Sequence, residues 1–137
     1  MDYIDYIDYT ECARSAMVVP SLTVLAPPRL TLEDLQKSGG TPACPTLLQF
    51  GSEMCAHCPA ATIAVSQATA NFKFTWIYSD VLGELGEEFI IGKLPAIVIW
   101  KGDTEDFELF QGIRGQEQVL DIIKKHCQPR LQLDADF

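Results

Sequence analysis

The side chains of this chain that could most clearly carry out chemistry are two cysteines separated by two residues. Cys55 and Cys58 lie in the stretch FGSEMCAHCPA, with His57 between them and Pro59 directly after the second cysteine. Such a pair can form and release a disulfide, can supply two of the four ligands of a zinc site, or can be two small apolar residues that happen to be close. The elements on either side must decide between these interpretations.

The residues around the pair predict a regular succession of strands and helices. Apolar runs and alternating patterns predict strands at 21–26, 44–52, 72–80, 96–102 and 107–113. Capping residues and amphipathic spacing predict helices at 31–40, 59–72, 81–93 and 116–127. The order βαβαβαββα is typical of an α/β domain.

This order places Cys55 at the C-terminal end of a buried strand and at the start of a helix, where open α/β sheets carry their reactive groups. The unpaired N–H groups and the positive end of the helix dipole favour thiolate over thiol at that point. Cys58 follows one turn later, within disulfide reach, and we expect the helix to shelter it. The pattern therefore favours reversible disulfide exchange, with Cys55 attacking and Cys58 resolving.

A zinc site is disfavoured by the number of ligands. Structural zinc requires four, and no second C-x-x-C or H-x-x-H pair occurs in the chain. Cys44, His126 and Cys127 would have to converge on Cys55 and Cys58 to complete a site. We therefore expect neither a metal nor another bound cofactor.

Composition restricts the partners and the location. The 137 residues carry a formal net charge of −9 and contain no basic run, which argues against a nucleic-acid or anionic-membrane surface. The apolar run 17–28 follows acidic residues and is broken by prolines, so it predicts neither a secretory signal nor a spanning helix. The odd number of five cysteines favours a reducing, cytoplasmic location, with Cys12, Cys44 and Cys127 as free thiols.

The ends of the chain differ from the middle. Residues 1–20 begin with Asp-Tyr-apolar units that repeat every three residues, a period that fits neither a strand nor a helix. We expect an acidic arm at 1–20, one domain at 21–127 and a tail at 128–137. The arm is interpreted either as a solvated segment or as a docking segment for a protein partner, with its tyrosines aligned along an extended three-fold helix.

Four features in order resemble the thioredoxin-like family over about residues 21–127. They are the strand TLLQF, the motif CAHC, the segment KLPAIVIW and the closing stretch FQGIRGQEQVLDIIKK. The resemblance implies a three-layer α/β sandwich, with helices on both faces of a mixed central sheet of about five strands. It also implies a protein-disulfide oxidoreductase that acts on protein or small-molecule disulfides or dithiols, without a cofactor.

The resemblance further implies roles for residues around the dithiol. Pro95 matches a cis-proline that lies against the two cysteines and shapes the substrate groove. Leu94, Met54 and Gly112 are expected to line the same groove. His57 is expected to stabilise the thiolate, which makes the disulfide form more oxidising than that of thioredoxin.

Three positions depart from the family's pattern. Met54 stands where a tryptophan is usual, and Gln49 stands where a buried acid assists proton transfer to the resolving thiol. Trp76 replaces a lysine that often accompanies that acid. Together with the tyrosine-rich arm, these departures support an alternative function as a structural or interaction component of a large assembly such as a virus particle, with a vestigial or accessory dithiol.

Overall fold

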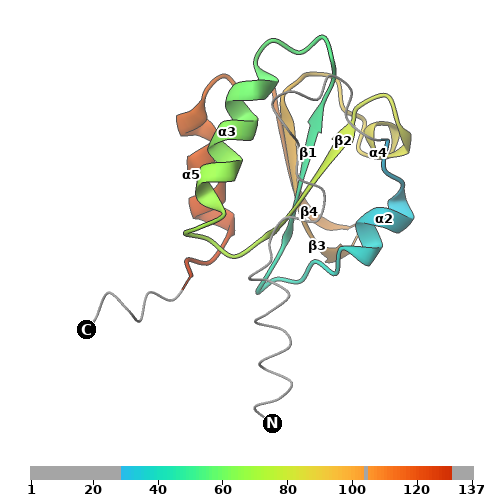
Figure 1. Cartoon of the computed structure of the whole chain (residues 1–137). Coiled ribbons are helices and arrows are strands. Elements are labelled where there is room, and N and C mark those ends of the chain that lie inside the picture. The colour runs from blue at the N-terminus through green and yellow to red at the C-terminus, as the bar shows by residue number, and fades with distance from the viewer. Residues whose placement is uncertain (1–28, 104, 131–137) are drawn as a thin grey trace, which may run out of the picture.

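The computed structural model describes residues 29–103 and 105–130 of the protein (Figure 1). Helices within these ranges are α2 (Leu32–Lys37), α3 (Cys58–Ala68), α4 (Glu84–Glu88) and α5 (Gln116–His126). Strands are β1 (Thr46–Gly51), β2 (Thr75–Asp80), β3 (Ala96–Asp103) and β4 (Asp106–Gln111). In this part of the chain, no helix is long and apolar enough to cross a membrane.

The strands form one mixed sheet in the order β2-β1-β3-β4. β1 runs parallel to β2, with Gly51 opposite Asp80, and α3 supplies the crossover that a parallel pair requires. β3 runs antiparallel to both β1 and β4, with Ala96 opposite Phe50 and Gln111. The C-terminal ends of β1, β2 and β4 and the N-terminal end of β3 therefore lie along one edge of the sheet, called the site edge below.

Helices cover both faces of the sheet, with α3 and α5 on one side and α2 and α4 on the other (Figure 1). The predicted α/β architecture with a mixed sheet is confirmed. Its described part has four strands rather than about five, because the strand predicted at 21–26 lies outside the described residues. The proposed arm at 1–20 and most of the proposed tail lie outside them as well.

Two buried clusters hold the layers together, and β1 contributes to both. All six residues of β1 are buried, and successive side chains point to opposite faces of the sheet. Leu47 packs with α3 and α5, whereas Leu48 and Phe50 pack with α2 and α4. A near-continuous apolar run is what a strand covered on both faces requires.

The helices differ in how well their bounds were predicted. A capping box forms at the start of α2, since the Asp34 amide donates to Thr31 Oγ1 at 3.2 Å and the Thr31 amide donates to Asp34 Oδ2 at 2.8 Å. The helix predicted at 81–93 is wrong in extent, because α4 has only five residues. The chain leaves helical geometry at Ile90, which has a φ of 55°.

The cysteines outside the C-x-x-C pair behave in different ways. Cys127 is a free thiol, 5% exposed, against α3 and α5. The prediction that Cys44 is free is wrong, because Cys44 is disulfide-bonded. Whether a thiol pairs depends on which cysteine the fold brings near it, and cysteine spacing does not contain that information. Cys12 lies outside the described residues.

Burial raises the pKa of the Cys127 thiol to about 12, from 9.0 for an ordinary cysteine. Between these values the unfolded chain binds fewer protons than the folded chain, so the free energy of unfolding falls as pH rises. The loss should approach about 1.4 kcal/mol per pH unit, and it should be absent below pH 9. Urea titrations from pH 8 to 11 measure how the free energy of unfolding changes with pH. This free energy should fall less steeply with pH in Cys127→Ala than in the wild type, and an equal pH dependence in both proteins would contradict the assignment.

Candidate functional site

The C-x-x-C pair lies where β1 ends at the site edge and α3 begins. Cys55 is in the turn between them, and its amide donates to the Ser52 carbonyl oxygen at 3.2 Å. Ser52 Oγ accepts from the Met54 amide at 3.0 Å, which holds the same turn. α3 starts at Cys58 with Pro59 in its first turn, where a proline costs no helical hydrogen bond.

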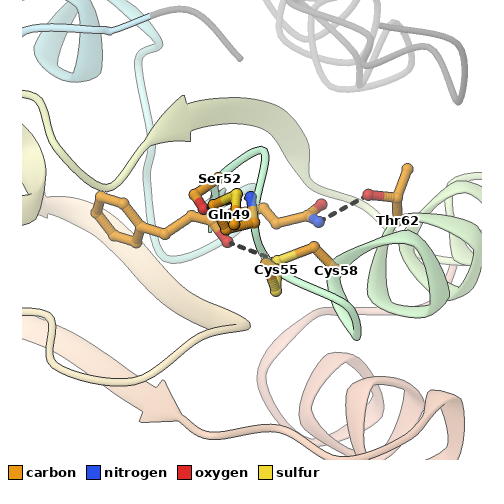
Figure 2. Close-up of a disulfide and its surroundings, with 7 residues drawn as sticks. Gln49, Ser52, Cys55, Cys58 and Thr62 are labelled. Atoms are coloured by element: carbon orange, nitrogen blue, oxygen red, sulfur yellow. Dashed lines mark hydrogen bonds between the residues drawn. A yellow bond between two sulfur atoms is a disulfide. The ribbon is translucent and has the colours of Figure 1, made fainter. Parts of the chain in front are cut away.

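Cys55 and Cys58 form a disulfide, with their Cα atoms 5.5 Å apart (Figure 2). That separation is normal for a disulfide. The two sulfurs differ in their surroundings. Cys58 is 3% exposed, with its Sγ 4.0 Å from the carbonyl oxygen of Phe50, whereas Cys55 is only half-buried. A partner molecule can therefore approach Cys55 more easily than Cys58.

The residues proposed for the substrate groove all lie at the site edge. Leu94 and Pro95 directly precede β3, and the peptide bond between them is cis. Pro95 is buried, and its carbonyl oxygen accepts from the Ile113 amide at 3.2 Å. Gly112 follows β4 and has a φ of 67°, a conformation that favours glycine. Met54, in the turn after β1, is 90% exposed.

His57 is the N-cap residue of α3 and is exposed. Its side chain makes no capping hydrogen bond to the helix. The imidazole is therefore not held by the first turn of α3, and His57 lies between the two cysteines in the chain.

A buried set of polar side chains connects β1, α3 and β2 close to the dithiol. Gln49 is fully buried, and its Nε2 donates to Thr62 Oγ1 at 2.8 Å. Trp76 Nε1 donates to Gln49 Oε1 at 3.0 Å. The sequence drew attention to Gln49 and Trp76 as departures from the family's pattern, but it gave no reason to select Thr62.

Solved structures of thioredoxins superpose on this chain. A Plasmodium falciparum thioredoxin aligns with a TM-score of 0.59 and 17% identity, covering 74% of this chain and 88% of that one. A mutant thioredoxin from Halobacterium salinarum aligns with a TM-score of 0.60 and 15% identity, covering 80% and 97%. Chloroplastic thioredoxin z aligns with a TM-score of 0.54 and 18% identity, covering 75% and 96%. The chain has the thioredoxin fold.

The comparisons with sequences give no further assignment. No protein-family model and no curated protein sequence matches the chain. Within the described residues of this thioredoxin fold, no group of three or more His, Cys, Asp or Glu side chains could hold a metal ion.

Tyr78 is a residue near the site that the sequence did not single out. It lies on β2 opposite Gln49, which makes it a diagonal neighbour of Gly51 on the same face of the sheet. A Cβ atom on Gly51 would collide with the Tyr78 hydroxyl oxygen and would lie 2.8 Å from its ring Cζ. Burial, and then the negative charge of Asp80, raise the pKa of Tyr78. The missing side chain at Gly51 thus makes room for a neutral phenol.

The contact between Tyr78 and Gly51 predicts a specific coupling. Gly51→Ala should lower the free energy of unfolding by about 1–3 kcal/mol, because the Tyr78 ring must move to admit the methyl group. The same change in a Tyr78→Ala background should cost much less, since the colliding atoms are absent. A double-mutant cycle by urea denaturation measures the difference. Equal costs in the two backgrounds would show that the ring does not limit position 51.

Proposed function

We propose that the protein is a thiol–disulfide oxidoreductase that uses the Cys55–Cys58 dithiol and disulfide on protein or small-molecule substrates. The observation that carries this proposal is the disulfide at the start of α3, with one accessible and one buried sulfur. A helix N-terminus favours a thiolate on the accessible cysteine, which is the form that attacks a disulfide.

The exchange proceeds in two balanced steps. The Cys55 thiolate attacks one sulfur of a substrate disulfide, forms a mixed disulfide with it and releases the other substrate sulfur as a thiolate. Cys58 then loses its proton and attacks Cys55 Sγ, which forms the Cys55–Cys58 bond and releases the second substrate thiolate. Two electrons pass from the dithiol to the substrate, and the two released thiolates take up protons. The reverse sequence oxidises a substrate dithiol.

The groove residues support a peptide segment as the substrate of this exchange. Met54 offers an exposed, flexible and polarisable side chain beside the turn that carries Cys55. The half-buried Leu94 brings apolar surface to the same edge, and the buried Pro95 that follows it has no backbone N–H. A surface of this kind accepts varied side chains around a substrate cysteine.

The roles of the two cysteines can be separated by trapping. Cys58→Ser should accumulate mixed disulfides with substrate, because the resolving sulfur is gone, whereas Cys55→Ser should accumulate none. In the reduced protein, iodoacetamide at pH 6 should modify Cys55 at least about tenfold faster than Cys58, since only a thiolate reacts. Both experiments belong in a Cys127→Ala background, and mass spectrometry locates the adducts. Equal alkylation of Cys55 and Cys58 would count against these roles.

The histidine between the cysteines predicts an oxidising potential. We expect a reduction potential between about −270 and −120 mV, the range from thioredoxin to the strongest oxidant of this kind. His57→Ala should make the potential more negative by about 30 mV or more, because the thiolate loses a neighbouring imidazole that stabilises it. Equilibration with glutathione measures both values.

The matched control for this measurement is His126→Ala, because His126 lies at the end of α5 with its ring 5.4 Å from that of Phe110. Its loss should leave the potential of the dithiol unchanged. A wild-type potential well below −270 mV, or equal shifts in the two histidine variants, would contradict the role given to His57.

A further inference from the structure

The buried side chains of Gln49, Thr62 and Trp76 form an uncharged polar layer, called the neutral layer here. They are 0%, 7% and 2% exposed, and the two hydrogen bonds that join them are 2.8 and 3.0 Å long. The indole N–H of Trp76 can only donate, so it must meet the oxygen of the Gln49 amide. The amide nitrogen is thereby turned toward Thr62. None of the three groups gains or loses a proton in the physiological pH range.

The neutral layer lies next to the resolving cysteine. Thr62 follows Cys58 by four residues on α3, which places both on the same side of the helix. Cys58 Sγ is 4.0 Å from the carbonyl oxygen of Phe50, the residue after Gln49 on β1. Figure 2 shows the Gln49 amide extending toward Thr62 beside the disulfide. A proton acceptor in place of the Gln49 amide would lie in the same buried region as Cys58.

The elements packed around the dithiol offer few other titratable groups that could accept a proton from Cys58. The rest of β1, the residues of α3 after Cys58 and the paired residues 96–100 of β3 contain none. The turn and α5 carry exposed acidic and basic side chains, namely Glu53, His57, Glu117, Asp121, Lys124 and Lys125. His126, at the end of α5, is half-buried.

β2 contributes two further titratable groups, Asp80 and Tyr78. Asp80 already has partners of its own, and Tyr78 is neutral. Asp80 Oδ1 accepts from the Leu82 amide at 2.9 Å, and its Oδ2 lies 3.7 Å from Arg29 Nε. The Asp80 carboxylate is therefore held by the turn at Leu82 and by Arg29, in the segment before α2. Tyr78 is held as a neutral phenol by burial and by Asp80. It can donate a proton but is no base.

We propose that Cys58 gives up its proton to solvent and not to an internal base, and that Gln49 acts as a positioning residue that holds α3 against β1. The proposal rests on the function proposed above. In the resolving step, the Cys58 S–H bond breaks and water takes the proton. The sulfur then bonds to Cys55 Sγ, and the bond between Cys55 and the substrate sulfur breaks. The substrate sulfur leaves with the electron pair and is protonated by water.

The test follows the resolving step alone, with Ellman's reagent as an aromatic disulfide. The reduced full-length chain releases one thionitrobenzoate when Cys55 attacks and a second one when Cys58 resolves the mixed disulfide. The Cys55→Ser/Cys58→Ser double variant keeps the other cysteines and supplies the baseline. The rate of the second release should rise about tenfold per pH unit from pH 5 to 7, because only the thiolate of Cys58 reacts.

Two substitutions at Gln49 separate proton transfer from packing. Gln49→Glu puts a carboxyl group of nearly the same shape beside Cys58, so the second release should be at least about tenfold faster at pH 6 and should level off above the pKa of that carboxyl. Gln49→Leu removes the amide without adding a base, so it should keep the wild-type slope even where the fold is less stable. Where Gln49→Leu does not fold, Thr62→Val takes its place.

Each outcome decides the proposal. A wild-type rate that is flat from pH 5 to 7 would reveal an internal base and overturn it. A changed slope in Gln49→Leu or Thr62→Val would mean that the neutral layer itself moves protons, and an unchanged profile in Gln49→Glu would mean that it lies out of reach of Cys58. A protein that reacts with the reagent once and never releases a second equivalent refutes the proposed function as well, which distinguishes the two failures.

Discussion

The position of β1 between β2 and β3 is the constraint on which the rest of the molecule depends. Because β1 is parallel to one neighbour and antiparallel to the other, three strand ends and one strand start meet at the site edge. The turn with Cys55, the cis bond before β3 and Gly112 after β4 come together for this reason alone. Burial of all six β1 residues stabilises that pairing, since each face of the strand packs against a separate cluster.

The site edge is built with almost complete satisfaction of its buried polar groups. Gln49 would be costly in the centre of a sheet without partners, and it has one on each side, in Thr62 and Trp76. Among the described residues, the only buried side-chain nitrogen or oxygen atom without a hydrogen bond is Trp100 Nε1, which belongs to the opposite cluster. A satisfied network makes the region behind the dithiol rigid.

The fold and the chemistry are separate findings. Solved thioredoxins at 14–18% identity superpose on the chain, and that similarity establishes the fold alone. The case for disulfide exchange comes from this chain's own residues: the bonded pair at a helix start, the difference in burial between Cys55 and Cys58, and the exposed Met54 beside them.

The sequence alone determined the features that depend on local pattern. Period-two and period-3.6 spacing located the sheet and most of its helices, and the C-x-x-C spacing located the dithiol, because a side chain's face follows from the residues beside it. Only the tertiary structure decided that Thr62 completes the layer at Gln49, that Tyr78 fills the space at Gly51 and that Cys44 is bonded. The first two contacts join residues 13 and 27 positions apart, where strand register and helix packing set the distances, and no local period encodes them.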